Sequence, residues 1–174
     1  EYPGQIVAQG LGPAGSLRTF ATGRLVVWTT RTDLDLNDPA AVVRAATVRK
    51  IAIAQPRTAP YGRAAQAALE KLDAWSAAAP KLVFGESISQ TAQFVETGNA
   101  DLGLVALSLV VSPKLANQGC WREISPELFA AVPLDHAAVL TTRGAANPAA
   151  KRFLEFLGSD AAKTILRASG YRVP

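Results

Sequence analysis

The stretch IAIAQPRTAPYGRAAQAALEKL, residues 51–72, contains a candidate strand, a turn and a candidate helix in succession. Its first four residues are all apolar, which is the pattern of a strand covered on both faces. Pro and Gly residues then interrupt the chain, and apolar residues recur afterwards at the spacing of a helix. We therefore predict a strand that ends at Ala54 and a helix that begins near Pro60 and runs to Trp75.

Strand-like and helix-like segments alternate on both sides of this stretch. Apolar, β-rich runs and helical patterns follow one another at residues 24–30, 38–46, 50–54, 61–75, 81–84, 88–97 and 101–108. Alternation of this kind is typical of βαβ units around a mostly parallel sheet. The sequence therefore predicts an α/β fold.

The two ends of the chain do not complete such units. The first 20 residues combine a short helical pattern with a Gly/Pro turn, and regularity weakens again after Ser108. A candidate strand at 137–142 precedes two candidate helices, which Asn147 and either Ser159 or Asp160 would cap. We expect these end segments to belong to a second, incomplete lobe.

Composition excludes several classes of protein. The chain has 174 residues, of which 49% are hydrophobic and 18% charged, and its formal net charge is +4. Its Lys and Arg residues are scattered, so we predict no nucleic-acid partner. No apolar run approaches the roughly 20 residues of a membrane-spanning helix. Cys120 is the one cysteine, and we expect it to be a buried thiol. The sequence starts at Glu1 and contains no Met, so we expect a leading segment to have been removed.

The turn after residue 54 is a candidate anion site. Ligands of open α/β sheets bind beyond the carboxyl ends of the strands. Pro60 suits the first position of a helix, and the amides of Tyr61, Gly62 and Arg63 then lack helical acceptors and attract anions. Gly62 would also allow a ligand to approach the backbone.

A second strand-to-helix junction, FGESISQ at residues 84–90, repeats this arrangement. Ser87 is a candidate N-cap, and the amides of Ile88 and Ser89 open the helix. Ordinary capping explains either junction alone, because most such turns bind nothing. Two helix starts at one edge of a sheet are better evidence for an anion site.

Catalytic motifs are scarce. His136, beside Asp135, is the one histidine, and Ser108 follows a strand without a nucleophile-elbow motif. The phosphate-binding and dinucleotide-binding glycine motifs are absent. We therefore predict a protein that is not an enzyme. The alternative, an enzyme for an acidic substrate, would depend on His136 or Ser108.

Three longer stretches of the chain resemble the periplasmic molybdate-binding proteins of ABC transporters. They are RKIAIAQPRTAPYGRAAQAALEKLDAW, PKLVFGESISQTAQFVETGNADLGLVALS and NPAAKRFLEFLGSDAAKTILRASGY. The similarity extends over nearly the whole chain, and the APYG turn and the QTAQFV run are its most specific parts. The resemblance implies the two-lobed fold of class II periplasmic binding proteins, with a molybdate or tungstate dianion between the lobes. It implies no cofactor, delivery to a membrane permease and a periplasmic location, with the signal peptide outside this sequence.

The resemblance also assigns site residues by position. The main-chain N–H groups of Tyr61 and Ile88 correspond to oxyanion donors, with Gly62, Ser87 and Ser89 as weaker candidates. A position that is tyrosine in some members falls on Ala106, so a phenol contact would be absent there. Family members carry an N-terminal lobe segment with further ligands that has no counterpart here.

The organisation implied by the resemblance has three parts. Residues 1–20 are a remnant of lobe I, residues 21–129 form a complete lobe II, and residues 130–174 return to lobe I. The missing segment of lobe I could be supplied by another chain. Two alternatives remain open for the function: an effector-sensing domain of a transcription regulator, or a binding protein for another oxyanion such as sulfate or phosphate.

Overall fold

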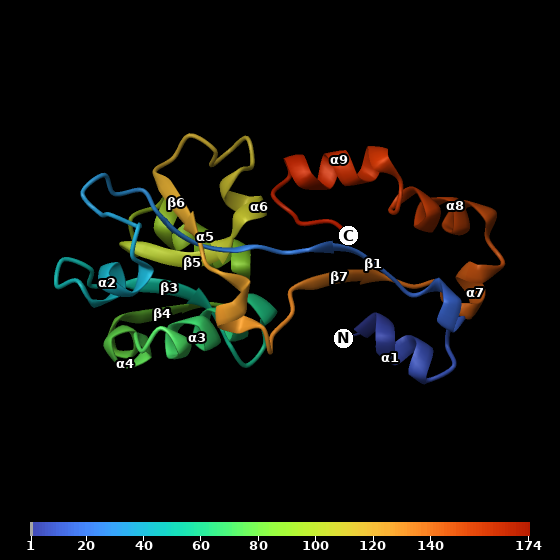
Figure 1. The fold of residues 1–174 in the computed structure, drawn as a ribbon, viewed down its shortest axis with the longest axis horizontal. Helices are drawn as coiled ribbons and strands as arrows, with labels where there is room; N and C mark the ends of the chain where they lie inside the picture. Colours follow the sequence, from blue (N-terminus) through green and yellow to red (C-terminus); the bar gives the residue numbers. More distant parts are fainter. Residues whose placement is uncertain (1) are drawn as a thin grey trace. The chain divides into compact units, whose positions relative to one another are not determined.

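The chain folds into two compact units, each of which is described separately (Figure 1). The computed structural model describes residues 2–174, except for the side chains of Tyr2 and Ala14. Unit 1 combines the residues up to Gly23 with Asp135–Pro174, and unit 2 is Arg24–Leu134. The chain thus passes between the units twice, after Gly23 and after Leu134, whereas boundaries at residues 20/21 and 129/130 were predicted.

A five-stranded mixed sheet forms the centre of unit 2. Its strand order is β4-β3-β5-β2-β6. β3 pairs in parallel with both β4 and β5, while β2 pairs antiparallel with β5 and β6. The α/β fold is therefore confirmed, with parallel pairing in the half of the sheet built from βαβ units. The strands are β2 (Leu25–Thr29), β3 (Ile51–Ala54), β4 (Leu82–Gly85), β5 (Leu102–Ala106) and β6 (Cys120–Glu123).

Helices cover both faces of this sheet. α3 (Pro60–Lys71) buries its apolar stripe against one face, in a cluster that includes Ile53. α5 (Ile88–Glu96) packs on the other face, in a cluster that includes Ala52. Neighbouring strand residues alternate between the two clusters because successive side chains of a strand point to opposite faces. The shorter helices are α2 (Pro39–Arg44), α4 (Trp75–Ala78) and α6 (Leu107–Val110), with 3₁₀ turns at Ala79–Lys81 and Pro126–Phe129.

The helix predicted at residues 61–75 was too long. α3 ends at Lys71, and Asp73 adopts a left-handed backbone with φ of 53°. Trp75 begins the separate α4, although its ring still packs against the larger apolar cluster. The apolar periodicity therefore identified the buried face correctly but did not reveal the break, because Asp tolerates the left-handed conformation without a glycine.

β6 was not predicted, and the expected burial of Cys120 was wrong. β6 is an edge strand, and Cys120 is exposed. Trp121 is 42% exposed on the same strand. A strand with one partner and so little burial lacks the continuous apolar run that marked the central strands.

Unit 1 contains one two-stranded ribbon and a set of short helices. β1 (Arg18–Thr22) pairs antiparallel with β7 (Asp135–Ala138), so the strand predicted at 137–142 starts earlier, and β1 was not predicted. Asn147 and Ser159 cap the last two helices as predicted, each accepting a hydrogen bond from a main-chain N–H. The helices are α1 (Tyr2–Ala8), α7 (Thr142–Ala145), α8 (Pro148–Phe156) and α9 (Asp160–Ala168), with a 3₁₀ turn at Ala14–Ser16. None of the helices described is long and apolar enough to cross a membrane.

The carboxylate of Asp101 ties the amino ends of β3 and β5 together. It accepts hydrogen bonds from the main-chain N–H groups of Arg49 at 2.7 Å and Lys50 at 2.9 Å. Arg31 donates to its other oxygen at 2.8 Å. Burial raises the pKa of Asp101, but these three donors outweigh burial and hold the pKa below its ordinary value of 3.8. The charged form of Asp101 therefore stabilises the folded state at neutral pH. This stabilisation is lost only as the pH falls through the folded-state pKa of Asp101.

We predict that Asp101→Asn lowers the free energy of unfolding of unit 2 by about 1–3 kcal/mol, because an asparagine must turn its NH₂ group toward one set of donors. Urea denaturation followed by the fluorescence of buried Trp28 measures the change. Asp33→Asn is the matched control, because Asp33 also pairs with Arg31 but its side chain is 62% exposed. Equal effects of the two substitutions would contradict the role given to Asp101.

Candidate functional site

The carboxyl ends of β3, β4 and β5 meet at one edge of the sheet of unit 2. Ala54 lies opposite Gly85 in the parallel pairing, and the N–H of Gln55 donates to the Gly85 carbonyl at 2.8 Å. β5 runs parallel to β3 on its other side and ends at Ala106. Since α3, α5 and α6 follow these three strands, the structure brings the three helix starts to the same edge.

α3 starts at this edge without a side-chain cap. Its N-cap is Ala59, which has extended backbone angles and no side-chain oxygen to accept a hydrogen bond, and Pro60 occupies the first helical position. Arg63 makes the first helical bond, donating to the Ala59 carbonyl at 3.1 Å, so its amide is not available as the sequence analysis expected. Tyr61 occupies the second position of the helix, and its ring packs against the larger apolar cluster.

Gly62 has a packing role at the start of α3. A Cβ atom at this position would lie 2.2 Å from the carbonyl oxygen of Ala54. The helix can therefore approach the end of β3 this closely only with a glycine. Close packing of helix on strand explains this glycine without a ligand.

α5 starts with a capped first turn. The Ser87 hydroxyl accepts a hydrogen bond from the N–H of Gln90 at 3.2 Å, and the Gln90 side chain accepts from the N–H of Glu86 at 2.7 Å. This reciprocal arrangement resembles a capping box, and the Ser-x-x-Gln spacing could have revealed it in the sequence. Among residues 2–174, no acceptor is found for the amides of Ile88 and Ser89. These two N–H groups are consequently the donors that α5 presents at the edge.

The third strand end offers neither a hydroxyl nor a phenol. Ala106 is buried at the end of β5, and the N–H of Leu107 donates to the carbonyl of Arg24 at 2.9 Å. The Arg24 guanidinium pairs with Glu123 through bonds of 3.0 and 2.5 Å. Hydrogen bonding to Glu123 raises the pKa of Arg24, so the arginine stays charged and the pair is neutral as a whole. Sequence reasoning missed this pair because its members are 99 residues apart.

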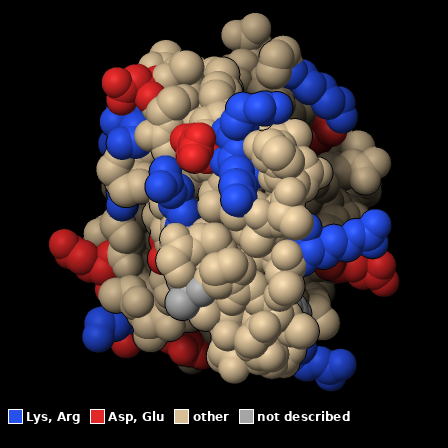
Figure 2. Space-filling view, turned by 90° about the vertical axis from the view of Figure 1, so that its right-hand side faces the viewer, with Lys and Arg blue, Asp and Glu red and all other residues tan. Residues whose placement is uncertain are grey.

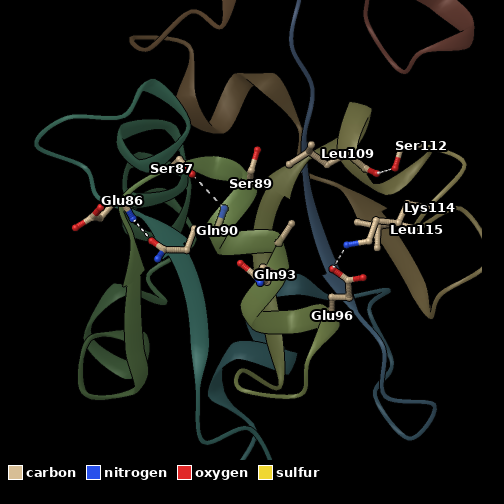
Figure 3. Close-up of a pocket in the computed structure, with 11 residues that line it drawn as sticks. Glu86, Ser87, Ser89, Gln90, Gln93, Glu96, Leu109, Ser112, Lys114 and Leu115 are labelled. Atoms are coloured by element: carbon tan, nitrogen blue, oxygen red, sulfur yellow. Dashed lines mark hydrogen bonds and ion pairs between the residues drawn. The ribbon is translucent and has the colours of Figure 1, made fainter.

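A groove of about 810 Å³ runs beside α5 and begins at the same helix start (Figure 3). Ser87, Ser89 and Gln90 line one part of it, and the Lys114–Glu96 ion pair of 2.8 Å lies at another. In Figure 3 the Ser89 hydroxyl points away from the bonds that Ser87 and Gln90 make. The carboxylates of Glu86 and Glu96 disfavour an anion inside the groove. The sheet edge, where α3 and α5 start, is therefore the better candidate for an anion site.

The two candidate catalytic residues lie in different units. His136 belongs to β7 of unit 1, where its ring is 5.2 Å from that of Tyr171 and 6.3 Å from that of Phe20. Burial lowers the pKa of His136, so its neutral form packs between the two aromatic rings at neutral pH. Ser108 lies in α6 of unit 2. No group of three or more potential metal ligands was found in the described part of the chain.

Known proteins share both the sequence and the fold. The chain is 38% identical over 169 residues to the molybdate-binding proteins of Azotobacter vinelandii and Rhodobacter capsulatus. These matches cover 97% of this chain but 66% and 64% of the relatives, so the chain spans less than two thirds of their length. The solved structure of the periplasmic molybdate-binding protein of Azotobacter vinelandii matches with a TM-score of 0.85 and 29% identity. That match covers 99% of this chain and 74% of the solved one.

A family model supports the same relationship over nearly the full length of this chain. The model is described as bacterial extracellular solute-binding protein, and it matches residues 1–172. The match includes both units and both passages between them. This chain belongs to the family of bacterial extracellular solute-binding proteins.

Proposed function

We propose that this protein binds molybdate or tungstate in the periplasm and delivers it to an ABC transporter. The observation that supports this most directly is the meeting of the α3 and α5 starts at one edge of the sheet. Helix starts concentrate N–H donors and the positive end of the helix dipole, which together favour an anion. The molybdate-binding proteins of Azotobacter vinelandii and Rhodobacter capsulatus, at 38% identity, support the choice of oxyanion.

The proposed donors are main-chain groups. The N–H of Ile88 belongs to the first residue of α5, and that of Tyr61 to the second residue of α3. Ser89 offers a further N–H and an exposed hydroxyl, while Gly62 and Ser87 support the geometry of the two turns. Hydrogen bonds to a doubly charged oxyanion are stronger than bonds between neutral groups, so no cationic side chain is needed. The Ala106 side chain has no polar atom, so it would contribute only to the shape of the site.

Two protein partners follow from this proposal. The first is the membrane permease of an ABC transporter, which would receive the oxyanion. The second is the polypeptide segment that completes lobe I, whether it belongs to the same chain or to another one. No nucleic acid is expected as a partner, because the Lys and Arg residues are scattered along the sequence.

Calorimetric titration with molybdate, tungstate, sulfate and phosphate tests the ligand. We expect heat from molybdate and tungstate and much less from sulfate and phosphate, because a site shaped for the larger tetrahedral ions holds smaller ones less closely. Equal heats for all four ions, or none for any, would contradict the proposed selectivity. A preference for sulfate or phosphate would favour the alternative oxyanion.

Ile88→Pro tests the main-chain donor directly. Ile88 is the first residue of α5, where proline is tolerated, and Ser87 before it has the extended backbone that proline requires. The substitution therefore removes one N–H while leaving the helix in place. A hydrogen bond to a charged group contributes about 1.5–3 kcal/mol, so we expect roughly 10- to 100-fold weaker molybdate binding.

Ile88→Ala is the matched control. It also removes the side-chain contacts that Ile88 makes with the apolar cluster under α5, but it keeps the N–H. Molybdate titration and thermal unfolding of both variants separate loss of the donor from loss of packing. If the alanine variant lost as much affinity as the proline variant, the N–H of Ile88 would not be a ligand donor.

A further inference from the structure

The first turn of α5 packs against the end of β4 at backbone distance. Gly85, the last residue of β4, is buried. A Cβ atom at this position would lie 2.8 Å from the main-chain nitrogen of Thr91 and 3.0 Å from the carbonyl oxygen of Ser87. Rotation of a side chain cannot relieve contacts with backbone atoms, so α5 can begin this close to β4 only beside a glycine.

The hydroxyl of Thr91 makes a second contact in this turn. Thr91 is fully buried, and it donates twice to the carbonyl of Ser87, through its N–H at 3.0 Å and its hydroxyl at 2.9 Å. A hydroxyl that bonds to the carbonyl four residues earlier slightly destabilises a helix. Helix stability therefore does not explain a buried threonine at this position.

The two bonds to the Ser87 carbonyl fix the direction of the neighbouring N–H. The carbonyl of Ser87 and the N–H of Ile88 belong to one peptide unit, which is planar. Among the residues that the structure describes, every peptide bond is trans, so these two groups point in opposite directions. Thr91 thus holds the N–H of Ile88 in one orientation without touching it.

The other side of Gly85 connects this turn to the start of α3. Its carbonyl accepts a hydrogen bond from the N–H of Gln55 at 2.8 Å, and Gly85 itself lies opposite Ala54 in the parallel pairing. Gly62 of α3 approaches the Ala54 carbonyl so closely that a Cβ atom would lie 2.2 Å from its oxygen. Backbone contacts therefore link the starts of α3 and α5 through the ends of β3 and β4.

We propose that Gly85 and Thr91 are positioning residues that make the anion site selective for the size of the oxyanion. The inference rests on the proposed function, because it concerns the same site. Donors of a selective site must keep their places to within about 0.5 Å. Rigidly held donors cannot close around a smaller ion such as sulfate, whereas a helix start that could shift would adapt to either ion. Backbone packing at Gly85 and the bond from Thr91 provide this rigidity.

The test must separate the size of the ion from its charge. Lys and Arg side chains gather in the upper part of the side of the molecule shown in Figure 2. Such surface cations attract any dianion, and added salt weakens the attraction. Molybdate and sulfate carry the same charge, so the ratio of their affinities at constant salt reports size and geometry.

Gly85→Ala and Gly103→Ala form a matched pair, because both crowd α5. Gly103 lies in β5, and a Cβ atom there would lie 2.8 Å from Cγ2 of Val95, near the other end of the helix. We expect both substitutions to lower the midpoint of thermal unfolding. Only Gly85→Ala should also lower the molybdate-to-sulfate affinity ratio, by about 10-fold, because it displaces a donor to a charged ligand. Calorimetric titration with molybdate, alone and in competition with sulfate, measures this ratio.

Thr91→Val and Thr91→Ser test the hydroxyl, and they decide the question even if Gly85→Ala does not fold. Valine keeps the branched shape but cannot donate to Ser87, so the ratio should fall roughly 3-fold, as expected for one neutral hydrogen bond. Serine keeps the donor and should leave the ratio at the parent value. Equal ratios for the two glycine variants, or for the two threonine variants, would overturn this inference and leave the proposed function intact. A parent chain that bound no molybdate would overturn both.

Discussion

Parallel pairing of β3 with β4 and β5 is the constraint on which the rest of unit 2 depends. Parallel neighbours need long crossover connections, so each strand must be followed by a helix or loop that returns along the sheet. The returns place α3 on one face and α5 on the other, and both helices start where their strands end. The grouping of helix N-termini at one edge is thus a consequence of strand direction, independent of any ligand.

The two edges of this parallel region differ in how their polar groups are satisfied. At the amino edge, Asp101 occupies the main-chain donors that precede β3. At the carboxyl edge, the Ser87 hydroxyl accepts from one N–H of α5, while Ala59 has no side-chain acceptor for α3. The bonds to Asp101 at the amino edge stabilise the fold, whereas the helix starts at the carboxyl edge attract an anion. The proposed anion site therefore depends on the carboxyl edge.

The central elements of unit 2 could be predicted because each has a simple physical signature. β3 and β5 are continuous apolar runs, and α3 has an apolar stripe, so their order alone predicted the α/β fold. β1 and β6 were missed because strands with so little burial carry no such run. The Arg24–Glu123 pair could not be predicted, because its two residues are 99 positions apart in the sequence. The packing role of Gly62 could not be predicted either, because it depends on how closely α3 approaches the end of β3.

The contrast between the units explains why sequence patterns were informative in one and ambiguous in the other. In unit 2 the apolar runs of β2, β3 and β5 are buried, so local pattern and final burial agree there, although Phe84 of the apolar strand β4 is 46% exposed. In unit 1, α8 and α9 have clear helical periodicity and the predicted caps, yet Phe153, Phe156 and Ile165 are exposed. The spacing of apolar residues along a helix indicates which face of the helix is suited to burial. A helix can therefore be assigned correctly from its apolar pattern even where large apolar side chains of that pattern are exposed.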